Sequence, residues 1–511
     1  MSGRKIFKAV AIITVFSILT RALGFLFRIF LSRALGAELL GEYQVAMSVF
    51  GVLLTFICSG LPLVVSRSVA SKRADNDLEG EYKVVGAGLC ISLAITIIVT
   101  LVILIIPNAI TALFSNNISS TMLFLLLPAL ISSSLYSIFR GAMWGQKRFF
   151  AISFTELFEQ VLRMILCAIL LSVGITSLSL PELAGLSLSL ACIGSAILAT
   201  IIYFAVGGKV KQPKFFIKPL LKTSTPITAV RTISSLVQSF IALIIPIRLM
   251  AAGLTQGEAL AEFGIATGMT LPLLMVPCTL ISSIAVAFVP EISGQTDNID
   301  KQPPRELAKL KTHINLCVNV SIVIAFILFP AFAAIGMPIG EALFHNEKAG
   351  YYLMLSAIVM LPICLSQITS SILNSLGLEM KSLINYAIGA ILLFLSIFFL
   401  PKWIGAVSLI VGLGSLYFVT TILNLVMLHK RNLLSFTYVK NILLLLVVSI
   451  PCILFTKWFY QILSHYMSLF ISTAITGAVS VGLFVSICAI FNLANFRIIL
   501  FRKRKVAKAT A

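Results

Sequence analysis

Apolar residues gather into fourteen runs, separated by short stretches rich in charged, Pro, Gly or Asn residues. A helix that crosses a bilayer needs about 20 mainly apolar residues, so each run predicts one transmembrane helix. Pro272 and Pro277 lie in the eighth run and predict a kink there. The predicted helices cover residues 9–32, 42–66, 84–107, 120–140, 150–174, 183–206, 223–248, 262–291, 313–337, 350–374, 383–400, 404–428, 440–460 and 467–492.

Composition agrees with this pattern. Of the 511 residues, 59% are hydrophobic and only 11% are charged, and the mean hydropathy is +1.07. A soluble domain carries about 25% charged residues, so a water-facing surface could not be covered here. The sequence therefore predicts an all-α polytopic membrane protein.

Basic residues predict the orientation of the helices. The net charge is +20, from 38 Lys and Arg against 18 Asp and Glu. Of these basic residues, 29 lie in segments on the side of the N-terminus, five lie on the opposite side and four lie within predicted helices. Loops rich in Lys and Arg stay in the cytoplasm. Both termini are therefore expected there, the charge reflects topology, and no nucleic-acid partner is expected. The basic start MSGRKIFK resembles a signal peptide, but Arg21 and Arg28 interrupt the apolar stretch, so an uncleaved first helix is expected.

Enzyme chemistry has no support in the sequence. The nine cysteines are scattered singly, and no Cys/His metal spacing, nucleophile elbow or phosphate loop occurs. We therefore expect no enzyme, no cofactor and no metal, and no direct use of ATP.

Two short strings repeat in the two halves of the chain. GEYQVA at 41–46 matches AEFGIA at 261–266, and TALFSNN at 111–117 matches EALFHNE at 341–347. Copies of six helices keep their orientation, so the lobes are expected to be related by a twofold axis along the membrane normal. The sequence predicts an N-terminal lobe at 1–206, a basic cytoplasmic linker at 207–222, a C-terminal lobe at 223–428, and two further helices with a basic tail at 429–511.

The linker, GGKVKQPKFFIKPLLK, alternates lysines with apolar residues. It predicts either an amphipathic segment lying on the anionic inner leaflet or a plain basic loop.

Charged residues within the predicted helices are candidate site residues, because a charge at mid-bilayer costs at least about 2.5–3.5 kcal/mol and usually faces a cavity or a partner. Arg21 lies about 18 Å into the first helix. Arg28 lies near its outer end, where a long side chain can snorkel to the interface.

The fifth predicted helix holds Glu156, Glu159, Gln160 and Arg163 within eight residues. Glu159 and Arg163 have the i,i+4 spacing of an ion pair. A self-contained pair is one interpretation. A water-filled cavity is the other, because one Arg cannot neutralise two carboxylates.

The seventh predicted helix places Arg231, Ser234, Ser235 and Gln238 on one face. Such a stripe is either a helix-packing seam or a cavity lining, and Arg231 favours the cavity.

These residues lie in strings that resemble a known family. TRALGFLFRIFLSRALGAELLGEYQVA (20–46), FRGAMWGQKR (139–148), ELFEQVLRM (156–164) and ILNSLG (372–377) are similar to the polysaccharide-transporter group of the multidrug/oligosaccharidyl-lipid/polysaccharide exporter superfamily. The resemblance implies a V-shaped, two-lobed alternating-access transporter of a bacterial cytoplasmic membrane, and a role in sporulation. Relatives include lipid II flippases, whose cavity cations engage a lipid diphosphate, and multidrug antiporters. Glu156 departs from the family, which tends to have Gln there.

Two functions follow as hypotheses. The favoured one is a flippase for a lipid-linked cell-wall saccharide, such as a peptidoglycan precursor, because Arg21, Arg163 and Arg231 suit an anionic diphosphate. The alternative is a cation- or proton-coupled multidrug antiporter that uses Glu156 or Glu159. A scaffold that transports nothing would not need buried charge. The substrate-binding candidates are Arg21, Arg163, Arg231, Glu159, Glu156, Gln160 and Gln238. The expected partners are the lipid-linked saccharide and membrane lipids, and a coupling ion is left open.

Overall fold

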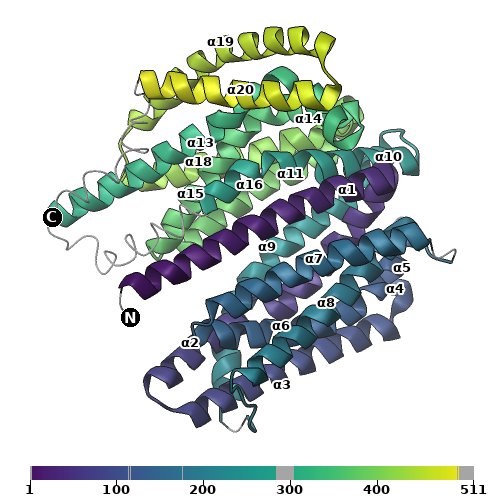
Figure 1. Ribbon diagram of the computed structural model, residues 1–511, viewed down its shortest axis with the longest axis vertical. Coiled ribbons are helices and arrows are strands. Elements are labelled where there is room, and N and C mark those ends of the chain that lie inside the picture. The colour runs from purple at the N-terminus through teal and green to yellow at the C-terminus, as the bar shows by residue number, and fades with distance from the viewer. Residues whose placement is uncertain are drawn as a thin grey trace. The chain divides into compact units, whose positions relative to one another are not determined.

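In a computed structural model the chain forms helices and no strand across the residues that the structure describes, which are 3–112, 114, 117–174, 177–213, 215–282, 304–491 and 493 (Figure 1). The predicted all-α membrane fold is confirmed. Five predictions lie partly outside the described residues. They are the end of the eighth helix, the string TALFSNN, the linker at Lys214, the last residue of the fourteenth helix and the basic C-terminal tail.

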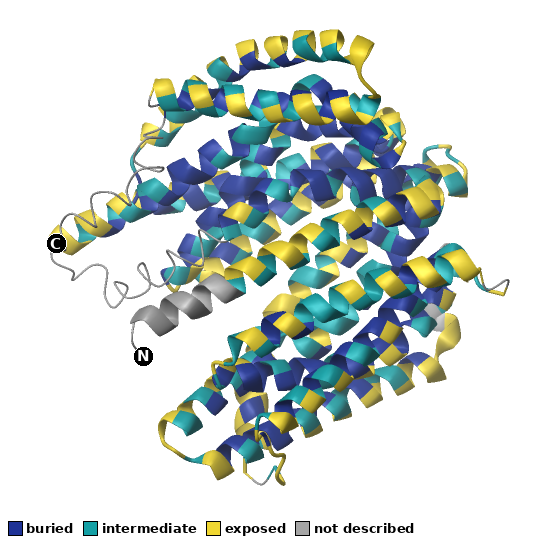
Figure 2. Ribbon diagram, in the orientation of Figure 1, coloured by how far each residue is buried: buried dark blue, intermediate teal, exposed yellow. Residues whose placement is uncertain are grey.

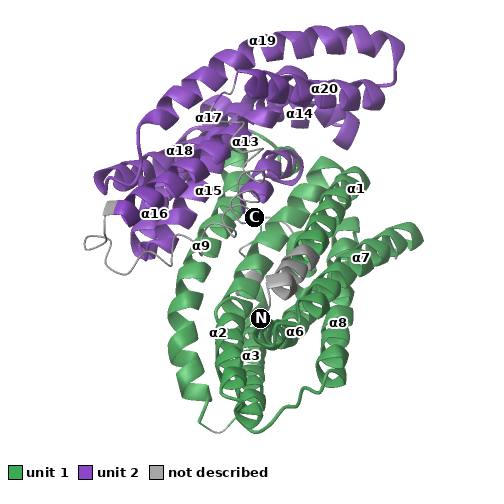
Figure 3. Ribbon diagram, turned by 60° about the vertical axis from the view of Figure 1, so that its left-hand side comes forward, with its two compact units in different colours: residues 1–250, 254–264 green, residues 251–253, 265–511 purple. Residues whose placement is uncertain are grey.

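Two compact units divide the chain, one of residues 1–250 and 254–264 and the other of residues 251–253 and 265–511 (Figure 3). The helices of the first unit are α1 Gly3–Cys58, α2 Leu61–Ala74, α3 Leu78–Ile105, α4 Pro107–Thr111, α5 Asn117–Leu125, α6 Leu127–Gly145, α7 Phe149–Val173, α8 Leu180–Ala205, α9 Ile217–Ala251, whose last residue lies in the second unit, and α10 Gln256–Gly264.

The second unit begins with an unusual segment. A π-helix, η1 Ile265–Thr270, follows α10 directly and leads into α11 Leu271–Leu274. The later elements are α13 Pro304–Phe344, α14 Glu347–Ser356, η3 Ala357–Val359, α15 Met360–Ser375, α16 Glu379–Phe399, α17 Pro401–Ile404, α18 Val407–Lys430, α19 Thr437–Tyr466 and α20 Leu469–Ile490. The chain bends by 44° between residues 256–274 and 276–282. The kink predicted from Pro272 and Pro277 is therefore confirmed.

Ten helices in the described part of the chain are long and apolar enough to cross a membrane, or twelve if two bent pairs each count as one span. The first of the ten runs over 62 residues, about three times the length that a bilayer core requires. It contains a break at Gly36, so it can supply two spans. α7 has the length of a span but carries three charged side chains. A second span in the first segment and a span at α7 would raise twelve to the predicted fourteen. The number fourteen stays a prediction.

The boundary between the first two spans differs from the prediction. The helix continues through most of residues 33–41 and is interrupted only at Gly36, whose φ of 74° is open to glycine at little cost. The predicted second span, 42–66, is instead divided at Ser59 and Gly60, just before Pro62 at the start of α2. Apolar content continues across both breaks, so it could not reveal them.

Contacts group α9 with the first unit, although the predicted division assigned residues 223–248 to the C-terminal lobe. α9 lies close against the break between α1 and α2. A Cβ atom added to Gly60 would meet the Thr228 hydroxyl and the Ser224 carbonyl at 2.3 and 2.6 Å. The division into lobes, linker and C-terminal helices stays a proposal.

Glycines allow helices of the first unit to touch through their backbones. A Cβ atom on Gly41 would lie 2.0 Å from the Leu260 carbonyl oxygen, and one on Gly264 would lie 2.2 Å from the Ala37 carbonyl oxygen. The Cβ atom on Gly264 would also lie 2.7 Å from the Gly41 nitrogen, so Gly41 of the first repeated string and Gly264 of its second copy lie against each other on α1 and α10. Similarly, a Cβ atom on Gly141 of α6 would lie 2.6 Å from the Pro62 carbonyl oxygen of α2.

Helix faces that point away from their own unit carry large apolar side chains, seen as yellow stretches in Figure 2. Ile98 and Ile105 of α3 are exposed in this way, as are Val447 and Leu454 of α19. Exposed apolar surface of this extent is rare on soluble monomers and fits a lipid environment.

A short polar turn joins α2 to α3. The Asp77 carboxylate accepts from the Gly80 amide at 2.7 Å and from Lys72 Nζ at 2.9 Å. These bonds hold the pKa of Asp77 below its ordinary value. Asp77 thus acts as the N-cap of α3.

Candidate functional site

The polar residues of α7 lie on one partly buried stripe. Glu156, Glu159, Gln160 and Arg163 are all partly buried, whereas Ile165 and Ile169 are exposed on the apolar side. α7 packs against α1, α6 and α8. The partners of the stripe come from these helices.

Arg163 is held by α1. Its guanidinium donates to the Tyr43 hydroxyl and lies 4.7 Å from the centroid of the Phe27 ring. An aromatic face attracts a cation, most strongly where water is excluded. Arg28 is near enough to Tyr43 and Arg163 to interact with both electrostatically. Arg28 therefore belongs to this cluster, beyond the snorkelling role predicted for it.

Glu156 is held by α6. Arg140 Nη1 donates to Glu156 Oε1 at 3.0 Å, and both side chains are about two-fifths exposed, at 42% and 40%. The Arg140 guanidinium also lies 5.9 Å from the centroid of the Tyr136 ring. The pair stands on the same side of α7 as the rest of the stripe, so Arg140 adds a cation to the site.

The ion pair predicted between Glu159 and Arg163 is not formed among the described residues. Arg163 turns to Tyr43 and Phe27, and Glu159 interacts with Ser195 of α8. Spacing along one helix predicted the pair, but a hydroxyl and an aromatic ring on α1 compete successfully for the guanidinium.

Two donors on the stripe are buried without an acceptor among the described residues. They are Gln160 Nε2 and Arg163 Nε. Gln160 Nε2 faces α1, since a Cβ atom added to Gly24 would lie 3.9 Å from it. A buried donor without a partner costs about 1–3 kcal/mol. The stripe therefore has two donors whose hydrogen-bonding capacity is not met in the described part of the chain.

Arg21 lies on the same face of α1. The two helices run parallel, because Phe16 meets Phe150 with ring centroids 5.6 Å apart and Phe27 meets Arg163 further along. Arg21 is three residues before Gly24 and seven before Arg28, spacings that share one helix face. Its side chain is exposed.

Arg231 lies at another point of the first unit. Its Nη1 donates to the Ser59 carbonyl oxygen at 3.0 Å, at the break between α1 and α2. The neighbouring Cys58 interacts with Ser137 and Arg140. Arg231 thus lies at the C-terminal end of α1, next to a residue that interacts electrostatically with Arg140. Gln238, two turns further along α9, is exposed.

We expect Arg231→Ala to lower the stability of the folded protein by about 0.5–1.5 kcal/mol, because the Ser59 carbonyl loses its donor at an exposed position. Transport per folded protein should fall less than in Arg163→Ala. Thermal unfolding of the purified protein, with activity normalised to the folded fraction, measures both. Val230→Ala, at the exposed neighbouring residue, is the control. An unchanged unfolding midpoint for Arg231→Ala would contradict the structural role of this bond.

Three members of the site were missed from the sequence. Arg140 stands at the end of an apolar run close to Lys147 and Arg148, a position that predicts a cytoplasmic residue. Tyr43 belongs to a repeated string, and Phe27 is one of many aromatic residues. The sequence signal for a site residue is a charge that interrupts an apolar run. Arg140 stands at the end of its run, and Tyr43 and Phe27 carry no charge.

Comparison with known proteins gives the family. Residues 6–295 match the family model described as polysaccharide biosynthesis protein. Over 412 residues the chain is 24% identical to stage V sporulation protein B of Bacillus subtilis (strain 168), an alignment that covers 76% of this chain and 77% of that protein.

Solved structures show the same fold. The lipid II flippase MurJ in an inward closed conformation matches with a TM-score of 0.70 and 13% identity, over 93% of this chain and 98% of that chain. An inward-facing multidrug resistance MATE family transporter of the MOP superfamily matches with a TM-score of 0.64 and 16% identity, over 81% and 95%. With the family model matching more than half of its length, the chain belongs to the polysaccharide biosynthesis protein family.

Proposed function

We propose that the chain is a flippase that moves a lipid-linked cell-wall saccharide across a bacterial cytoplasmic membrane by alternating access. The headgroup would enter from the cytoplasm. The family is described by polysaccharide biosynthesis, and two proteins similar to the chain are named for sporulation and for flipping lipid II. Transport in place of catalysis is part of the same proposal, as are both termini in the cytoplasm. The coupling ion is left open.

The polar residues of α7 and the arginines around them form what we call the arginine-rich stripe, and this stripe carries the proposal. Arg21, Arg28 and Arg163 line the α1–α7 contact, and Arg140 adds a fourth cation, against the carboxylates of Glu156 and Glu159. An arginine fork binds phosphate oxygens in pairs and with charge assistance. Gln160 Nε2 and Arg163 Nε are unpaired donors at this place. A lipid diphosphate supplies the acceptors that these donors lack.

The candidate site residues have different roles in this proposal. Arg21 and Arg163 contact the diphosphate, and Gln160 donates to it. Glu156 and Glu159 position the cations around them. Arg231 and Gln238 extend the site along α9.

The alternative, a cation- or proton-coupled multidrug antiporter, rests on the carboxylates and on the fold shared with a MATE family transporter. An organic cation would meet a stripe with more guanidinium groups than carboxylates. One of these carboxylates, Glu156, is already paired with Arg140. The charge balance therefore favours the anionic substrate.

Purified protein in proteoliposomes tests the proposal. We expect it to move a fluorescent lipid-linked diphosphate saccharide from one leaflet to the other, measured by the accessibility of the headgroup to an added enzyme or quencher. Protein-free vesicles and vesicles with Arg163→Ala protein are the controls. Export of an ethidium-like cation against a proton gradient, without movement of the lipid diphosphate, would establish the antiporter instead.

A further inference from the structure

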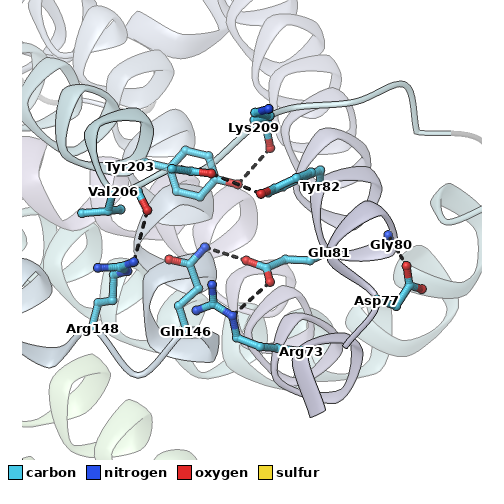
Figure 4. A network of polar contacts seen from close by, with 11 residues as sticks. Arg73, Asp77, Gly80, Glu81, Tyr82, Gln146, Arg148, Tyr203, Val206 and Lys209 are labelled. Atoms are coloured by element: carbon cyan, nitrogen blue, oxygen red, sulfur yellow. Dashed lines mark hydrogen bonds and ion pairs between the residues drawn. The ribbon is translucent and has the colours of Figure 1, made fainter. Parts of the chain in front are cut away.

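The start of the segment between α8 and α9 is held in place by nearby side chains, which donate hydrogen bonds to its main-chain carbonyl oxygens. Figure 4 shows Tyr203, Tyr82 and Arg148 directed at this segment, where their side chains donate to the carbonyl oxygens of Lys209, Gly207 and Val206 at 3.0, 3.2 and 3.1 Å. Because the acceptors are main-chain atoms, these bonds hold the backbone at residues 206–209 in place.

Charged groups beneath the segment strengthen this support. Glu81 is buried and accepts from Gln146 Nε2 at 2.6 Å, with Arg73 Nε at 3.3 Å from its other oxygen (Figure 4). Lys211 reaches Glu79 at 3.5 Å. The ends of α2, α3 and α6 thus form a rigid base for the segment.

The two phenylalanines after this base point in different directions. Phe216 packs against the buried cluster that contains Leu220, and Lys72 Nζ lies 5.7 Å from the centroid of its ring. Phe215 has a φ of 70°, a conformation that side chains other than glycine rarely adopt, and it is 93% exposed. This backbone conformation holds an aromatic ring away from the protein.

Phe215 stands beside a surface hollow with a volume of about 460 Å³, which Gln212, Pro213, Ile217 and Lys218 also line. Ile217, Leu221 and the lysines at 218 and 222 are exposed. The apolar floor and ammonium rim of this surface match a lipid that has acyl chains and an anionic headgroup.

The position of the hollow along the chain supports a lipid as the ligand. α8 and α9 are both candidate membrane spans, ending at Ala205 and beginning at Ile217. The short stretch between them therefore lies next to the membrane surface. Clusters of lysine beside a span are attracted to anionic lipids over about a Debye length, roughly 10 Å.

We propose that this surface binds an anionic phospholipid, with its headgroup at Lys218 and Lys222 and its acyl chains against Phe215 and Ile217. The site lies outside the arginine-rich stripe and goes beyond the transport function. Lipid bound here would hold the first turn of α9 at the membrane surface.

Quenching by brominated lipids in nanodiscs tests the proposal on the full chain. Phe215→Trp introduces an indole at the site, and the wild-type signal from the three native tryptophans is subtracted. We expect phosphatidylglycerol with brominated acyl chains to quench this indole more strongly than equally brominated phosphatidylcholine at the same mole fraction. Each lysine near an anionic lipid contributes roughly five-fold in affinity. Adding Lys218→Gln and Lys222→Gln should therefore reduce the preference by up to about 25-fold.

Adding Lys381→Gln and Lys440→Gln removes the same charge at two exposed residues of the second unit and should leave the preference unchanged. Equal quenching by both lipids, quenching by neither, or a preference that survives loss of Lys218 and Lys222 would overturn the proposal. The assay measures contact with lipid and not transport, so its outcome is independent of the proposed function.

Discussion

Arg163→Ala is expected to reduce transport of a lipid-linked diphosphate by about 10- to 100-fold per folded protein. A charged hydrogen bond contributes about 1.5–3 kcal/mol, and each 1.4 kcal/mol corresponds to about ten-fold. The variant removes the guanidinium that lies between Tyr43 and Phe27. Headgroup translocation in proteoliposomes, normalised to folded protein, measures the effect.

Three further variants separate substrate binding from structural support. Arg163→Lys keeps the charge but loses the planar fork, so it should restore little activity. Tyr43→Phe removes only the hydroxyl that holds the guanidinium and should be milder. Glu159→Gln should also be milder than Arg163→Ala, since the cation stays available. Full specific activity of Arg163→Ala together with a loss of folded protein would show that Arg163 only supports the fold.

Gly41→Ala is expected to destabilise the first unit by about 1–3 kcal/mol, the usual cost of forcing extra atoms into a packed contact. The added Cβ would lie 2.0 Å from a backbone atom, the Leu260 carbonyl oxygen, so α1 and α10 must separate. Thermal unfolding of purified protein and the yield of folded protein in the membrane report the effect.

Gly51→Ala is the matched control on the same helix, because a Cβ atom there would meet nothing within 4 Å. Alanine favours a helix over glycine by roughly 0.5–1 kcal/mol, so this variant should be as stable as the wild type or slightly more stable. Equal stability of the two variants would show that α1 and α10 can separate at this contact without loss of stability, contrary to the prediction.

Most of the helices could be predicted from the sequence, because a bilayer demands long apolar segments. The predicted runs 150–174 and 183–206 closely match α7 and α8. The breaks at Gly36 and Gly60 could not be predicted, since apolar residues continue through both. They depend on backbone conformation and on contacts with α9 that only the fold creates.

The cost of burying charge identified Arg21, Arg28, Glu156, Glu159 and Arg163 from the sequence. Their actual partners did not follow. The pair predicted from i,i+4 spacing was replaced by contacts to other helices, and Arg140 was hidden among basic residues near the end of its run. Whether Arg21, Arg163 and Arg231 act on one substrate stays a prediction.

The partners of α7 also bear on how the protein is made. Arg140 and Tyr43, which hold Glu156 and Arg163, both precede α7 in the chain. Synthesis proceeds from the N-terminus, so α1 and α6 leave the ribosome before α7. A helix with three charges is costly to release alone into lipid. These two contacts lower that cost, and α7 can therefore enter the bilayer against helices that are already there.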